Sequence, residues 1–234
     1  MIEDFDFETY LYISKDKFQI FVFNKKKLKN LYSQELKIDH QFDFKDFNIL
    51  LNFLDKNIYK IEKLIGNFIK NIILIVENDR NLKVNIGVKN KNYETSLKQK
   101  SFESNLSELK DLFKKNYQQQ TIMHMCIINY IIDGKRYSSF DSGLISDHFC
   151  IEVSFIAIDN KLVLEFDNVL EKYQIKIKQY MCGNYINNFI GDTDDEISII
   201  ANKLRNGLNI NEIAFAPKHR KNKGFFEKFF QLFS

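Results

Sequence analysis

The sequence is poor in glycine, proline and cysteine: its 234 residues include 8 Gly, a single Pro, 3 Cys and no Trp. The glycines do not cluster, so the chain lacks a Gly-rich loop of the kind that cradles phosphate groups. Cys126, Cys150 and Cys182 are odd in number and widely spaced, which indicates neither a disulfide framework nor a zinc knuckle. We therefore expect reduced thiols and a cytoplasmic location.

Long apolar runs are also missing. The runs at 72–76 and 127–132 are too short to span a bilayer and are typical of buried strands. The chain opens with acidic residues instead of the pattern of a signal peptide. A net charge of +3 is nearly balanced, so nucleic acid is not an expected partner. The 44% hydrophobic content, with 23 Phe, is enough for a Phe-rich core.

The polar residues offer no convincing active site. The four histidines lack the spacing of metal ligands: His40, His124, His148 and His219. His124 lies inside an apolar strand pattern, as core histidines do. His148 lies near Asp147 and Cys150, but neighbouring side chains on a strand point to opposite faces. The acidic run at 192–196 lacks the glycine and spacing of a calcium loop. We expect no catalytic residue, cofactor or metal, and a protein that is not an enzyme.

The first third of the chain has an α/β pattern. Alternating apolar residues predict strands at 9–14, 18–24 and 28–38. A helical period follows from 44 to about 68, and 71–77 is a β-branched run typical of a fully buried strand. A strand hairpin, a long helix and a buried strand predict an α/β-type first lobe at 1–80.

A second unit is predicted from residue 81 to residue 182. Its expected strands are 82–88, 121–132, 149–158 and 175–181, and its expected helices are 104–117 and 162–173. This order predicts an α+β subdomain with one sheet and helices on one face.

After this subdomain the pattern weakens. Thr193 and Glu196 have the spacing of a capping box, which predicts a helix to about residue 206 and a short helical segment at 183–207. Residues 208–223 have little pattern beyond a short strand at 212–215, and we expect a tether there.

The last residues combine basic side chains with an aromatic face. Wound as a helix, 224–234 places its large apolar side chains on one side. A basic cluster and such a helix suit an anionic bilayer surface, and the segment is too short to span one. Docking of the helix on this protein's own core is the alternative. The predicted membrane-binding residues are Lys218, Arg220, Lys221, Lys223, Phe225, Phe226, Phe229, Phe230, Leu232 and Phe233.

Five residues within 122–155 have a recognisable spacing: His124, Tyr130, Asp133, Gly134 and Gly143. The inserted subdomain of the bacterial cell-division protein FtsA has an apolar strand that ends in Asp-Gly, followed by a glycine-containing segment. The five residues match positions in that strand and segment. This part of the chain resembles that family, although Ile128 replaces a family proline. The resemblance implies a partial actin-like architecture with an SHS2-like inserted interaction subdomain, and the tail resembles the family's C-terminal membrane-targeting helix.

The first hairpin departs from the family. Actin-like ATPases carry a phosphate loop with an Asp and a Gly there, and this chain reads Tyr12-Ile13-Ser14-Lys15-Asp16 instead. The aspartate that acts through a metal and the glycine that lets backbone amides approach phosphate are both absent. The second phosphate loop, the adenosine pocket and the FtsZ-binding lobe of the family have no counterpart after the subdomain.

The resemblance and the departures together imply a non-enzymatic, FtsA-like protein, peripheral on the inner face of the cell membrane. Its expected partners are an anionic membrane surface and other division proteins, such as FtsZ or late divisome proteins, with self-association as a further expectation. Two alternatives stay open: an actin-like ATPase whose phosphate loop has diverged, and a generic membrane-surface adaptor unrelated to division. Measurable ATP affinity would favour the ATPase.

The tail generates the first prediction. Phe226→Glu combined with Phe230→Glu should abolish binding to anionic liposomes, because two charges would enter the acyl boundary. Neutralising the basic cluster should weaken binding in proportion to lipid charge, and high salt should have the same effect. Liposome co-sedimentation and thermal melts distinguish membrane binding from docking on the core. If the helix docks on the core, the two Glu substitutions should lower the melting temperature of the protein, and the behaviour of the chain should not depend on lipid.

Overall fold

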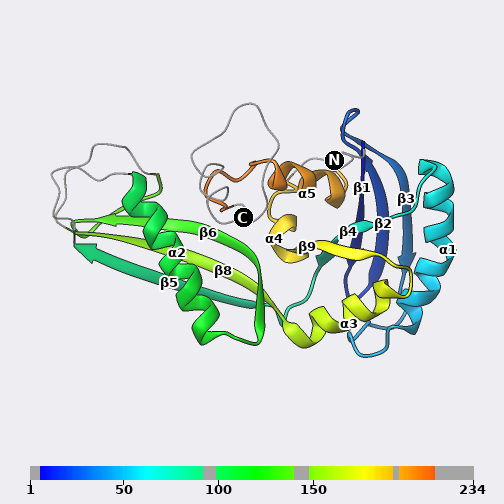
Figure 1. The fold of residues 1–234 in the computed structure, drawn as a ribbon, viewed down its shortest axis with the longest axis horizontal. Helices are drawn as coiled ribbons and strands as arrows, with labels where there is room; N and C mark the ends of the chain where they lie inside the picture. Colours follow the sequence, from blue (N-terminus) through cyan, green and yellow to red (C-terminus); the bar gives the residue numbers. More distant parts are fainter. Residues whose placement is uncertain (1–5, 92–98, 140–147, 192–194, 214–234) are drawn as a thin grey trace. The chain divides into compact units, whose positions relative to one another are not determined.

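The structure of the chain, a computed structural model, describes residues 6–91, 99–139, 148–191 and 195–213 (Figure 1). The chain divides into two compact units. Among the described residues, unit 1 contains those from 6 to 81 together with those from 159 to 205. Unit 2 contains those from 82 to 158 together with 206–213. Residues 82–158 are therefore inserted in the sequence of unit 1, and each unit contains two separate stretches of chain.

Unit 1 is built on a five-stranded sheet with the strand order β3-β2-β1-β4-β9. Strands β1, β2 and β3 form an antiparallel meander, while β4 pairs in parallel with β1 on one side and with β9 on the other. The bounds are β1 Phe7–Ile13, β2 Lys17–Asn24, β3 Lys29–Lys37, β4 Asn71–Val76 and β9 Lys176–Cys182.

Burial along these strands follows their place in the sheet. All residues of β4 except Asn71 are buried, as a strand covered on both faces requires, and its sequence is a run of β-branched residues and leucine. Edge strand β3 has no buried residue, and six of its nine residues are lysine, asparagine, serine, glutamine or glutamate.

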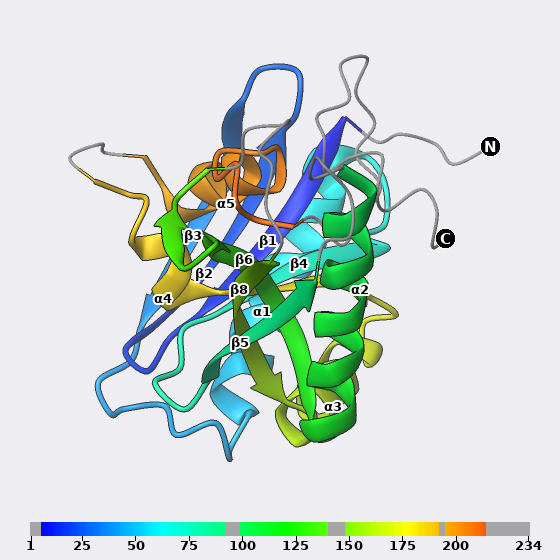
Figure 2. The same ribbon diagram turned by 90° about the vertical axis from the view of Figure 1, so that its left-hand side faces the viewer.

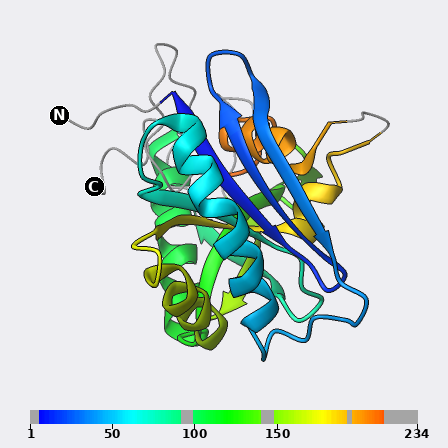
Figure 3. The same cartoon turned by 90° about the vertical axis from the view of Figure 1, so that its right-hand side faces the viewer.

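Helices cover both faces of this sheet (Figure 3). On one face lie α1 (Asn48–Ile65) and α3 (Asn160–Glu171), joined through aromatic contacts such as that of Phe47 with Phe166, whose ring centroids are 5.5 Å apart. Gly66 ends α1 with a φ of 68°, a left-handed conformation that glycine adopts at little cost.

The opposite face of the sheet is covered by α4 (Gly183–Asn187) and α5 (Ile197–Arg205). Their apolar side chains share one cluster with residues of β1, β2, β4 and β9. This cluster contains Tyr10, Tyr12, Phe21, Phe23, Ile73, Ile75, Met181, Ile186, Ile197, Ile200, Ala201 and Leu204.

A largely buried ion pair fixes the end of α5 to β1. Arg205 Nη1 donates to Glu8 Oε2 at 2.6 Å and to the Tyr10 hydroxyl at 3.0 Å, and Arg205 Nε donates to Gln179 Oε1 of β9 at 2.8 Å. Burial acts to raise the pKa of Glu8, but Arg205 outweighs it and the pKa is lowered. Glu8 therefore stays ionised, and its pairing with Arg205 stabilises the fold at neutral pH.

Unit 2 contains a four-stranded sheet with the order β5-β8-β6-β7 and one long helix on its face (Figure 2). The bounds are β5 Leu82–Lys91, α2 Gln99–Asn116, β6 Gln120–Ile132, β7 Lys135–Tyr137 and β8 His148–Asp159. Strand β5 is an edge strand that pairs with β8 in antiparallel register. Leu82 lies opposite Ala157 at one end of the pairing, and Lys91 lies opposite His148 at the other. Helix α2 packs Leu106, Leu109 and Phe113 onto β6 and β8.

The predicted α+β class is confirmed, but the end of the inserted subdomain was placed wrongly at 182. Helix α3 and strand β9 belong to unit 1, since β9 pairs in parallel with β4 from Asn71–Lys176 to Val76–Cys182. The Tyr180 hydroxyl also donates to Asp167 of α3 at 2.9 Å. An apolar alternation predicts a strand, but it does not say which sheet the strand joins. Helices α4 and α5, both within the predicted helical segment 183–207, likewise pack on the sheet of unit 1.

The predicted tether at 208–223 is wrong for its first residues. Residues 209–213, here called the docked segment, lie against β6. Ile127 N donates to Asn211 O at 2.9 Å, and Ile213 N donates to Met125 O at 2.8 Å. Ile213 is buried in the core of unit 2. The predicted capping box at Thr193 and the tail helix at 224–234 lie outside the described residues.

The core of unit 2 generates the second prediction. Phe155 is fully buried and stacks on Phe113 of α2, with 4.7 Å between the ring centroids. Phe155→Ala should lower the free energy of unfolding by about 3–5 kcal/mol, because it leaves a cavity under α2. Urea denaturation measures this. Phe68→Ala is the matched control, since Phe68 is 77% exposed and should change little.

Candidate functional site

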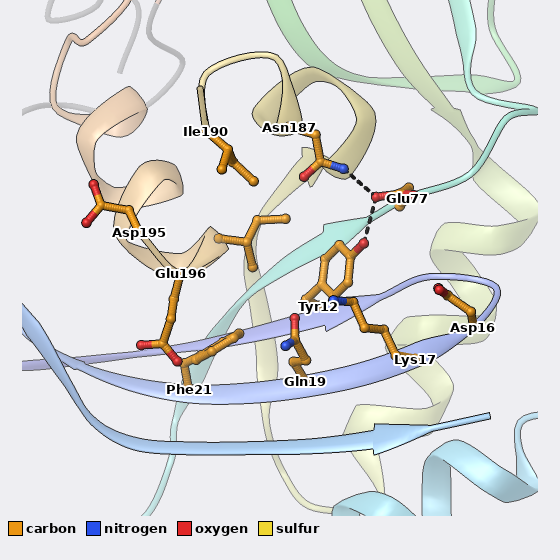
Figure 4. Close-up of a pocket in the computed structure, with 11 residues that line it drawn as sticks. Tyr12, Asp16, Lys17, Gln19, Phe21, Glu77, Asn187, Ile190, Asp195 and Glu196 are labelled. Carbon is orange, nitrogen blue, oxygen red and sulfur yellow. Dashed lines mark hydrogen bonds between the residues drawn. The ribbon is translucent and has the colours of Figure 1, made fainter. Parts of the chain in front are cut away.

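The hairpin between β1 and β2 borders a pocket in unit 1 of about 400 Å³ (Figure 4). Its lining comes from the hairpin strands, from Glu77 directly after β4, and from the segments around α4 and the start of α5. The lining residues are Tyr12, Asp16, Lys17, Gln19, Phe21, Glu77, Asn187, Ile190, Asp195, Glu196 and Ile197. We call it the hairpin pocket.

The hairpin turn is closed by its own hydrogen bonds. Ser14 Oγ donates to the Asp16 carboxylate and accepts from the Lys17 amide at 3.1 Å, while the Ser14 amide donates to Lys17 O at 3.0 Å. The Ser14 hydrogen bond is the largest cause of the lowered pKa of Asp16. Lys15 pairs with Asp79. The amides of Ser14 and Lys17 are therefore already used within the turn and do not point to an open anion site.

Glu77 is the centre of the polar wall of the pocket. Its Oε2 accepts from the Tyr12 hydroxyl at 2.6 Å and from Asn187 Nδ2 at 2.6 Å, as the dashed lines in Figure 4 show. Burial, then the hydrogen bond with Glu77, raises the pKa of Tyr12, so the phenol keeps its proton and acts as a donor. These bonds join β1, the end of β4 and α4 at one point.

Gly183 makes this junction possible. It follows β9 directly, as Glu77 follows β4, and Val76 and Cys182 are the last paired residues of these strands. A Cβ atom on residue 183 would lie 2.8 Å from Glu77 Cβ and 3.1 Å from Glu77 Cα. The two backbones are thus too close for any side chain at this position.

Acidic groups dominate the charge of the hairpin pocket. It has the carboxylates of Asp16, Glu77, Asp195 and Glu196 against the single ammonium group of Lys17. Each carboxylate has a partner within unit 1: Asp195 pairs with Lys203, and Glu196 accepts from Asn30 and Ser33 of β3. A phosphate group would meet net negative charge here.

The residues that carried the FtsA resemblance lie in unit 2, away from this pocket in the sequence and in another sheet. His124 and Tyr130 are buried in β6, and burial raises the pKa of Tyr130 to about 12. Asp133 and Gly134 form the turn into β7, with φ values of 47° and 81°. Gly143 lies outside the described residues, as do all ten predicted membrane-binding residues of the tail.

His124 is a structural partner of the docked segment. Its ring is fully buried, and Nδ1 lies 2.7 Å from Glu212 Oε1. The backbones form an antiparallel bridge between Cys126 and Glu212. Within the described part of the chain, no group of three or more His, Cys, Asp or Glu side chains is arranged to hold a metal ion. Among the described helices, none has the length and apolarity to cross a bilayer.

Sequence reasoning missed Glu77, Gly183 and Asn187. A signal for the first two exists: Glu77 is the last residue of the predicted strand 71–77, and Gly183 lies two residues after the predicted strand 175–181. The carboxyl ends of parallel strands gather side chains at one sheet edge. The two residues come together only when strand 175–181 pairs with strand 71–77, and the sequence does not specify that pairing.

No protein family and no curated protein matches the sequence. Solved structures resemble it at low identity. The PilM-PilN type IV pilus biogenesis complex matches with a TM-score of 0.44 at 7% identity, covering 78% of this chain and 49% of the matched chain. The cytoplasmic domain of EpsL, an inner-membrane component of the Vibrio cholerae type II secretion system, matches with a TM-score of 0.34 at 7% identity, covering 77% and 57%.

A third similar structure is a Bacteroides thetaiotaomicron protein with an actin-like ATPase fold and unknown function, with a TM-score of 0.32, 17% identity and coverage of 81% and 58%. The chain thus spans about half the length of the structures it matches, between 49% and 58%.

The close approach at Gly183 generates the third prediction. Gly183→Ala should lower the free energy of unfolding by about 1–3 kcal/mol, because the new methyl group forces the ends of β4 and β9 apart. Gly87→Ala is the matched control, since its Cβ would meet Cys150 Sγ at 3.4 Å and other atoms farther away. Equal urea midpoints for the two variants would contradict the role given to Gly183.

Proposed function

We propose that this chain is a non-enzymatic assembly protein that works at a membrane surface. Unit 1 serves as the rigid support, unit 2 presents the surface that partners bind, and the basic, Phe-rich tail attaches the chain to anionic lipid. The observation that carries the non-enzymatic part is the hairpin pocket, whose carboxylates and turn amides are already bonded to the chain's own groups.

This arrangement argues against nucleotide chemistry in two ways. An incoming phosphate would have to displace the hydrogen bonds within the turn, and each lost bond to a charged group costs about 1.5–3 kcal/mol. It would also approach Glu77 and Asp16 with only Lys17 to offset their charge. The hairpin pocket is better suited to holding β1, β4 and α4 together than to binding an anion.

The finer form of the proposal is an FtsA-like role in cell division, with recruitment of division proteins to the inner face of the membrane. Its support is the motif of His124, Tyr130, Asp133 and Gly134 in unit 2, together with the composition of the tail. Edge strand β5 offers a suitable binding surface, because a partner can add a strand to its outer edge through main-chain hydrogen bonds.

The hairpin pocket generates the fourth prediction. Isothermal titration of the folded chain with magnesium and ATP or GTP should show no binding in the micromolar range, because Tyr12 and Ser14 stand where a phosphate-binding hairpin needs an aspartate and a glycine. A micromolar dissociation constant would overturn the non-enzymatic proposal in favour of the ATPase alternative. Glu77→Gln serves as a control. If the nucleotide binds weakly to the unaltered chain and more tightly to this variant, the negative charge of Glu77 is what weakens nucleotide binding.

The division role has a separate test. The full chain on vesicles that contain phosphatidylglycerol should bring FtsZ into the pellet. If the chain pellets but FtsZ stays in the supernatant, the chain does not bind FtsZ directly. That result would favour the membrane-surface adaptor over the division role.

A further inference from the structure

The docked segment and β7 place exposed apolar and basic side chains along one edge of unit 2. Ile210 is 74% exposed and Leu208 is 47% exposed, although both precede the buried Ile213. Cys126 forms an isolated antiparallel bridge with Glu212, and Ile128 lies two residues farther along β6 from that bridge. Ile128 is itself an exposed side chain.

Strand β7 adds cations and an aromatic ring to this edge. Lys135, Arg136 and Tyr137 are all exposed, and they pair with the last residues of β6. Two acidic side chains lie near these cations. Asp133 accepts from the His148 amide at 3.3 Å, while Glu152 accepts from Asn129 at 2.7 Å and also lies 3.9 Å from Arg136, whose charge it partly offsets. We call Ile128, Lys135, Arg136, Tyr137, Leu208 and Ile210 the edge patch.

The sequence connects the edge patch closely to the tail. The docked segment is held by main-chain bonds, by the burial of Ile213 and by the contact of Glu212 with His124. Only residues 214–217 separate Ile213 from Lys218, the first of the basic cluster. At about 3.6 Å per residue, Lys218 can lie no farther than roughly 18 Å from Ile213.

We propose that the edge patch is a second contact with the anionic lipid surface, so that unit 2 meets the membrane directly at the point where the tail leaves it. This inference rests on the proposed attachment of the tail to lipid. The chemistry of the patch fits: Lys135 and Arg136 attract anionic head groups, while Ile210, Leu208 and Tyr137 suit the boundary between head groups and acyl chains. The short connection holds the patch close to any bilayer that the tail binds.

An environment-sensitive fluorophore on residue 210 tests the contact in the full chain. Cys150 is the one cysteine that is not buried, so Ile210→Cys in a Cys150→Ser background gives selective labelling. Tyr59→Cys in the same background is the matched control, because Tyr59 is 71% exposed on α1 of unit 1. With vesicles of phosphatidylglycerol and phosphatidylcholine in equal parts, we expect a blue shift at residue 210 and none at residue 59.

A charge substitution provides a second measurement. Ile210→Asp should weaken partition onto these vesicles about tenfold, the loss expected when one buried aliphatic side chain is replaced by a charge. Leu64→Asp, at a 52% exposed position of α1, should leave partition unchanged. Thermal melts establish that both variants fold.

The outcomes separate the two proposals. If the unaltered chain does not pellet with the vesicles, attachment through the tail is wrong, and the second contact is wrong with it. If the chain pellets but residue 210 shows no shift, the edge patch does not touch lipid, and attachment through the tail stands alone. Equal shifts at residues 210 and 59 would also overturn the edge patch, since the contact would not be specific to unit 2.

Discussion

The parallel pairing of β4 with β9 is the contact on which the rest of the fold depends. The chain leaves the sheet of unit 1 after Val76, builds the sheet of unit 2, and returns so that Cys182 lies beside Val76. The cost of closing so long a loop grows only with the logarithm of its length. A buried, β-branched strand such as β4 offsets that cost with apolar burial on both faces. The insertion is therefore tolerated as long as the two strand ends meet.

The ends of these two strands are also where the polar chemistry of unit 1 gathers. Glu77 and Gly183 approach until no side chain fits at residue 183, and Tyr12 and Asn187 complete the junction with hydrogen bonds. In an α/β sheet this edge is the usual place for a ligand site. Here the polar groups at this edge are hydrogen-bonded to one another within the chain, beside the hairpin pocket.

The sequence predicted individual strands and helices well, because their periods are local. The alternation at 18–24 and the β-branched run at 71–77 needed no knowledge of the rest of the chain. The sequence-based prediction failed where the position of a strand or segment depends on which other strand it pairs with. The pattern of β9 is compatible with either sheet, and only the pairing with Asn71–Val76 assigns it to unit 1. The docked segment was read as a tether because residues 209–213 are mostly asparagine and isolated isoleucines, and their backbone bonds to Met125 and Ile127 leave no mark in the sequence.

The discontinuity of both units has a consequence for how the protein forms during synthesis. Unit 1 needs α5 to cover Tyr10 and Phe23, and unit 2 needs Ile213 to complete its core. Neither hydrophobic core is complete when its first strands emerge from the ribosome, although domains often fold in the order in which they are made. The paired strands β1 and β2 in unit 1, and β5 and β8 in unit 2, therefore stay partly uncovered until residues much later in the sequence are translated. Until α5 and the docked segment have been made, the apolar faces of these strands lack the residues that cover them in the folded chain.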